Sequence, residues 1–102
     1  MQIIKKLSSH IEDEIKDAEC YAKEALKYRD ERRGLADVFF QLSLDEMKHM
    51  AVLHAEVVKM IEDYRRTNGE PPASMLAVYD YLHQRHIDDA AAVKALQAMY
   101  RE

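Results

Sequence analysis

The sequence predicts an all-α fold, in which an antiparallel helical hairpin is followed by a third long helix within one domain of 102 residues. The chain contains only two Gly and two Pro, which fall at Gly34 and in the run 68–72, so helix breaks are few and localised. The intervening stretches are rich in residues that favour helices, and their apolar side chains recur at helical spacing. We therefore expect helices at roughly 9–32, 35–67 and 73–101.

For the first helix, Ser9 followed by Glu12 has the spacing of a capping box, so we expect the helix to begin there after a lead-in turn or short helix at 2–7. Gly34 is placed to end it. Residues that share one arc of about 100° define its expected core stripe. These are Leu7, Ile11, Glu14, Ala18, Tyr21, Ala25 and Tyr28.

The second and third helices show the same amphipathic pattern. The stripe of the second comprises Phe39, Leu42, Glu46, His49, Leu53, Val57 and Met60. The Pro71-Pro72 pair is suited to open the third helix. Its stripe comprises Met75, Leu82, His86, Asp89, Val93, Leu96 and Tyr100. Asp88-Asp89 is also suited to cap a fourth, shorter helix, so we expect residues 73–101 to form either one helix or two.

Charge and composition exclude several classes of function. The net charge of -4 argues against nucleic-acid binding and against an anionic membrane surface. No apolar run is long enough to span a membrane. The single Cys20 cannot form an internal disulfide, and the first residues lack the pattern of a signal peptide, so we expect a cytoplasmic protein. Three helices enclose a thin core, and we expect pairing with a second copy to complete a bundle.

Two acids interrupt the expected apolar stripes, Glu14 on the first helix and Glu46 on the second. An ionised carboxylate in a core needs a partner. His49 follows Glu46 by three residues and so projects from the same face. In a chain of this composition, about half an occurrence of Glu-x-x-His is expected by chance, so the pattern alone is weak evidence for a metal site. Its position on a core stripe is the stronger evidence. The similar Asp80-x-x-His83 lies off the stripe of its helix and is read as a solvated pair.

Two copies of the chain would supply Glu14, Glu46 and His49 twice. A Glu from each of two helices and a Glu-x-x-His from each of two others form the ligand set of carboxylate-bridged di-metal sites. The mixed oxygen and nitrogen donors suit iron or manganese better than a closed structural zinc site, and zinc remains a further candidate. We therefore predict a di-iron or di-manganese site shared by a homodimer or a higher even-numbered homo-oligomer.

Over about residues 11–61, the sequence resembles the ferritin-like family, in particular its rubrerythrin-type and encapsulated-ferritin half-bundles. The resemblance rests on Glu14 followed by Tyr21, and on Glu46-Met47-Lys48-His49 placed 32 residues after Glu14. It implies a four-helix bundle with a di-iron centre at a subunit interface. It also implies oxidoreductase chemistry of the ferroxidase type, in which Fe(II) is oxidised by O2 or peroxide. Residues 99–102 do not resemble the shell-targeting peptide of the encapsulated members.

Several other residues are weaker candidates for this site. Tyr21 is expected either to pack in the core or to hydrogen bond a ligand carboxylate. His10, one turn before Glu14, is a candidate extra ligand, and His86 with Asp89 a candidate auxiliary pair. His54 and His83 lie off the stripes and are expected at the surface.

A metal-free function is the alternative. The chain would then be a helical interaction or assembly module, for instance one derived from a virus. In that interpretation Glu46 and His49 form a polar pair that fixes the register of an interface.

Overall fold

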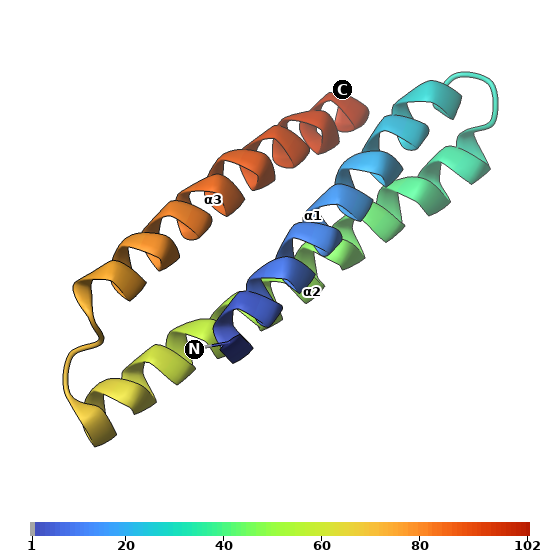
Figure 1. The fold of residues 1–102 in the computed structure, drawn as a ribbon. Helices are drawn as coiled ribbons and strands as arrows, with labels where there is room; N and C mark the ends of the chain where they lie inside the picture. Colours follow the sequence, from blue (N-terminus) through green and yellow to red (C-terminus); the bar gives the residue numbers. More distant parts are fainter. Residues whose placement is uncertain (1) are drawn as a thin grey trace.

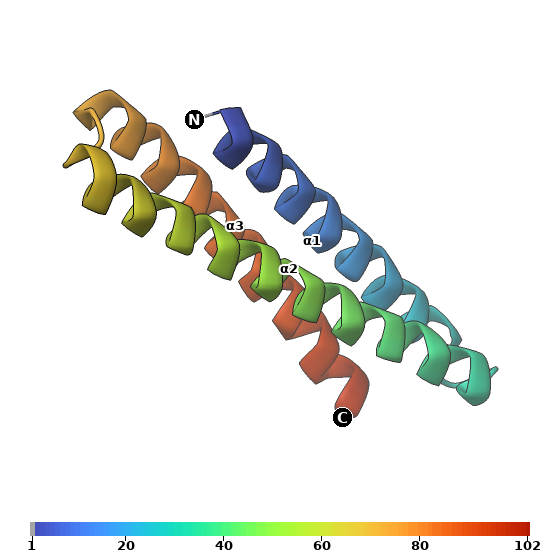
Figure 2. The same cartoon turned by 90° about the horizontal axis from the view of Figure 1, so that it is seen from below.

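The computed structural model describes residues 2–102 and contains three helices, α1 (Gln2–Tyr28), α2 (Arg33–Asn68) and α3 (Ala73–Arg101). The first two form an antiparallel hairpin, and α3 runs back antiparallel to α2 (Figure 1). The view in Figure 2 shows all three helices aligned along one rod, whose extents are 56 × 19 × 17 Å. The predicted all-α architecture of a hairpin plus a third helix is confirmed. Within residues 2–102, no helix combines the length and apolar character needed to cross a membrane.

Both ends of α1 differ from their predicted positions. The first helix begins at Gln2, so Ser9 lies two turns inside it and does not cap it. The apolar periodicity continues upstream to Ile4, which is buried, and this packing extends the helix. The helix ends at Tyr28, whose carbonyl accepts a bond from the Arg32 N–H. Gly34 lies in the first turn of α2 and does not terminate α1.

The second break lies where the sequence places it. Gly69 takes a φ of 81°, and its N–H donates to the Arg65 carbonyl at 3.0 Å, which ends α2. Pro72 occupies the N-cap position of α3. The prediction of a helix cap at Asp88-Asp89 is wrong, because α3 continues through these residues to Arg101. The Asp88 carboxylate instead accepts a hydrogen bond from Gln84, one turn earlier on the same exposed face.

The buried face of α1 is rotated by roughly 60° from the predicted stripe. It comprises Ile4, Ser8, Ile11, Ile15, Ala18, Ala22 and Ala25. On α2 the buried residues are Ala36, Ser43, Val57 and Ile61, while Leu42 and His49 of the predicted stripe are exposed. The rotation follows from α3, which packs mainly along α1 and covers only one flank of the hairpin. Glu14 and Tyr21 consequently lie at the edge of the buried face.

A buried hydrogen-bonded chain joins the three helices. The fully buried Ser43 hydroxyl of α2 donates to the Ala18 carbonyl of α1 at 2.7 Å. The same hydroxyl accepts a hydrogen bond from the Gln97 side-chain amide of α3 at 2.9 Å. These hydrogen bonds satisfy the polar groups inside the core, and they fix the axial position of α3 relative to the hairpin.

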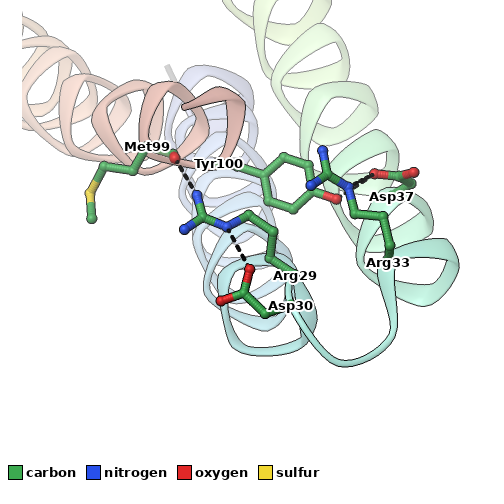
Figure 3. Close-up of polar contacts among 6 residues, drawn as sticks. All are labelled: Arg29, Asp30, Arg33, Asp37, Met99 and Tyr100. Atoms are coloured by element: carbon green, nitrogen blue, oxygen red, sulfur yellow. Dashed lines mark hydrogen bonds and ion pairs between the residues drawn. The ribbon is translucent and has the colours of Figure 1, made fainter.

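The C-terminal end of α3 is anchored at the α1–α2 turn, as Figure 3 shows. The Tyr100 hydroxyl donates a hydrogen bond to the Asp37 carboxylate, which also pairs with Arg33 at 3.2 Å. The Arg29 guanidinium donates to the Met99 carbonyl at 2.9 Å and so satisfies one of the free carbonyls at the end of the helix. These contacts hold the end of α3 against the turn.

Candidate metal centre

Glu14 of α1 lies close to Glu46 and His49 of α2. Glu46 and His49 are three residues apart on α2 and project from one face. The His49 Nδ1 atom lies 3.6 Å from Oε2 of Glu14 and 3.9 Å from Oε1 of Glu46. One donor atom from each residue lies within 4.8 Å of the other two, and no other group of this kind occurs within residues 2–102. The predicted juxtaposition of the three residues is therefore present in the fold.

The burial of the three side chains is uneven. Glu46 is 18% exposed and Glu14 27%, whereas His49 is 60% exposed. The Oε2 atom of Glu14 is buried without a hydrogen-bond partner, since a separation of 3.6 Å from His49 is too long for a hydrogen bond. A buried acceptor that carries negative charge and has no donor is costly. A bound cation would satisfy this oxygen atom.

The spacing and chemistry of the donors fit a divalent cation. Two donors bound about 2.1 Å from one ion at angles of 90–110° are roughly 3.0–3.4 Å apart. The observed distances from His49 to the two carboxylates exceed this by a few tenths of an ångström, which small rotations of the side chains would close. Two carboxylates balance the charge of one divalent ion, and the imidazole adds the nitrogen donor that iron, manganese and zinc accept.

The cluster lies on the flank of the hairpin that α3 does not cover. Glu12 faces α3, where its Oε1 lies 3.6 Å from His86 Nε2. Glu14 follows two residues later and so projects about 160° away from Glu12 around the helix. The acids and His49 therefore open toward solvent on the opposite flank, and three protein donors leave coordination positions free.

A strip of exposed apolar side chains borders the cluster on α2. It comprises Leu35, Val38, Leu42 and Val52, which are 39%, 56%, 36% and 69% exposed and which share the helical flank of His49. Exposed apolar patches next to polar residues mark surfaces that bind a partner. We call this set the α2 strip.

The weaker candidates are placed as follows. Tyr21 stacks on Phe39 with ring centroids 6.2 Å apart, and its hydroxyl makes no hydrogen bond to another residue of the range 2–102. Its bond to a ligand carboxylate therefore stays a prediction. His10 is exposed and does not join the cluster. Asp89 is exposed whereas His86 is buried, and neither belongs to the group of three possible metal ligands found within residues 2–102, so their auxiliary role stays a prediction.

A group of histidines lies on the opposite flank, and sequence reasoning missed it. His54 and His83, expected at the surface, are half-buried, and their rings stack at 4.6 Å. His86 lies one turn from His83 on α3, beside Glu12. The expectation was wrong because the buried face of α2 is rotated toward His54. The spacing of His83 and His86 on one face of α3 was the available signal.

Comparisons of this chain with models of protein families, with curated proteins and with solved structures found no match.

Proposed function

We propose that this protein binds a pair of divalent metal ions between two copies of the chain, as ferritin-like proteins do. The observation that carries the proposal is the buried, unpartnered Oε2 of Glu14 on α1, which lies beside Glu46 and His49 of α2. A negatively charged oxygen atom without a donor is favourable only if a cation neutralises it.

The second copy follows from the number of ligands and from the surface around them. One chain supplies two carboxylates and one imidazole, which is half of the ligand set of a di-metal bundle. The α2 strip leaves apolar area exposed beside the ligands, and a facing hairpin would cover it. Because α3 lies on the other flank, two hairpins can face each other without displacing it. The resulting dimer would contain a four-helix bundle made of α1 and α2 from each chain.

The metal we expect is iron, with manganese as the close alternative. Bound Fe(II) would supply electrons to O2 or peroxide at the coordination positions that the protein leaves free. Glu14 and Glu46 would neutralise the ions and favour the higher charge of the oxidised state, and His49 would complete each ligand set.

The test combines metal analysis with the oligomeric mass of protein purified without an affinity tag. We expect about one metal ion per chain in an even-numbered oligomer, since a two-chain site holds two ions. In the double variant Glu46→Leu/His49→Leu, the bound metal and the metal-dependent stability should both be lost. Glu62→Leu changes an exposed acid on α2 outside the Glu14 cluster, so it is the matched control and should keep both.

The same double variant distinguishes the metal-free alternative. If Glu46 and His49 only fix the register of a helical interface, replacing them with Leu should preserve or stabilise the dimer. An oligomer that contains no metal and is stabilised by the double substitution would overturn our proposal.

A further inference from the structure

We propose that an apolar cavity at the end of the rod that holds the α2–α3 connection (Figure 1) binds a small molecule with an apolar chain and a carboxylate, such as a medium-chain fatty acid, and that Lys5 pairs with the carboxylate. Ile4, which lines this cavity, precedes Glu14 by ten residues, about 15 Å along α1. No residue of the Glu14 cluster lines the cavity, so this inference does not depend on the proposed function.

The walls of the cavity are largely apolar and come from all three helices. Ile4 of α1 and Ile61 of α2 are 6% and 7% exposed and belong to the main hydrophobic core. The first turns of α3 contribute further apolar side chains, among them Leu76, Val78 and Leu82. The apolar chain of a ligand would therefore extend the core of the protein and remove this surface from water.

The cavity follows from the way α3 packs. Most packing of α3 is against α1, and α2 meets α3 at few positions. The connection 69–72 contains Gly69 and the Pro71-Pro72 pair, so neither helix continues through it and the two helix ends stand apart (Figure 1). The space left between them has a volume of about 260 Å³. Small-molecule sites have volumes of roughly 300–1,000 Å³, so we infer a ligand at the small end of this class.

The charge at the cavity favours an anionic end group on the ligand. Lys5 is the one charged residue that lines the cavity within residues 2–102, and no carboxylate of this range forms an ion pair with it. The first turn of α3 also contains no acidic residue. Ser74, likewise exposed, places a hydroxyl donor in the same lining. A carboxylate would gain from both groups, whereas an ammonium group would be repelled by Lys5.

Titration calorimetry with octanoate tests the site. We expect one octanoate per chain and a rise in melting temperature on its addition. Hexanoate has two fewer methylene groups and should bind more weakly, by up to about fourfold for each methylene lost. In wild-type protein, octanoate should shift the methyl NMR signals of Leu76 and Leu82, which lie inside the cavity.

Lys5→Gln tests the end group. The substitution removes the charge and should weaken octanoate binding by about fivefold, the value of an exposed ion pair, while binding of the uncharged 1-octanol stays the same. Lys6→Gln removes the neighbouring exposed lysine, which does not line the cavity, and should leave both affinities unchanged.

Val78→Asp tests the apolar wall. Val78 is 47% exposed, so the fold should tolerate the change, and a carboxylate in the wall should weaken octanoate binding by at least about tenfold. Ile87→Asp is the matched control, because Ile87 is also 47% exposed on α3 but does not line this cavity. Circular dichroism without ligand checks that both variants fold.

Three results would overturn the proposal. The first is the absence of saturable octanoate binding to the wild-type chain. The second is a Val78→Asp variant that binds octanoate as Ile87→Asp does, and the third is a Lys5→Gln variant with unchanged affinity for octanoate. Octanoate should bind Glu46→Leu/His49→Leu as it binds wild type, so the outcome here is separate from the outcome for the Glu14 cluster.

Discussion

The carboxylate of Glu14 on α1 faces the imidazole of His49 on α2, with 3.6 Å between Oε2 and Nδ1, and makes no hydrogen bond to it. A second carboxylate, that of Glu46, lies within 4.8 Å of both. Two carboxylates therefore lie close together at a partly buried position without enough hydrogen-bond donors. The metal-free site should lower the stability of the fold, a cost common at functional sites.

Glu14→Gln should therefore stabilise the metal-free chain. The substitution removes one of two like charges and provides an amide donor toward Glu46, so we expect the free energy of unfolding in the presence of a chelator to rise by about 1 kcal/mol. Urea denaturation measures it. Asp17→Asn, an exposed acid on the same helix, should change it by less than about 0.5 kcal/mol. A clear loss of stability in Glu14→Gln would show that the pair with His49 is itself stabilising.

The helix content was predictable because Gly and Pro are confined to two short regions. The start of α1 was not, since the capping-box pattern at Ser9 competes with apolar residues upstream. Ile4 packs against the core and carries the helix past the local signal. Local sequence patterns propose where a helix begins, and tertiary packing decides it.

Ser9→Ala distinguishes a cap from a mid-helix position. Ser9 lies inside α1 and is exposed, so Ala, the better helix former, should leave the free energy of unfolding unchanged or raise it by up to about 0.5 kcal/mol. An N-cap serine would instead lose about 1 kcal/mol. Thermal or urea unfolding decides between these values, and a loss of the larger size would place the start of the helix at Ser9.

The two histidine-containing clusters were not equally predictable. Glu14, Glu46 and His49 could be picked out because each lies on a helical stripe of the sequence, although the structure brings them together at the edge of the buried face and leaves His49 exposed. The group around His54 and His86 depends on which flank α3 covers, and this is settled by packing between helices distant in the sequence. A periodicity read one helix at a time carries no information about that choice.

Ser43→Ala should be strongly destabilising for its size. It removes the hydroxyl that donates to the Ala18 carbonyl and accepts from the Gln97 amide, and it leaves the Gln97 amide unpaired in the core, whereas the carbonyl keeps its bond within α1. We expect a loss of about 1–3 kcal/mol in the free energy of unfolding.

Gln97→Leu in the Ser43→Ala background removes the amide that has lost its partner and should recover part of that loss. Urea denaturation of the wild type, both single variants and the double variant gives the coupling between positions 43 and 97. Additive losses would mean that Ser43 and Gln97 do not act as a unit.

Tyr100→Phe should alter the acid response of the fold. The hydrogen bond from the Tyr100 hydroxyl, with a smaller contribution from Arg33, holds the pKa of the Asp37 carboxyl below its ordinary value. A carboxyl whose pKa is lower in the folded than in the unfolded chain contributes stability above the unfolded pKa, and this contribution is lost as pH falls through the folded pKa. The pH range in which this contribution is lost therefore lies below about pH 4.

In Tyr100→Phe, the pKa of Asp37 should rise toward its ordinary value, and the free energy of unfolding should depend less steeply on pH below about pH 4. Carboxyl NMR titration of Asp37 and acid unfolding measure the two effects. Tyr81→Phe, at a position that is 64% exposed on the same helix, is the control. An Asp37 pKa equal in wild type and Tyr100→Phe would mean that the hydroxyl does not anchor the end of α3 through this carboxylate.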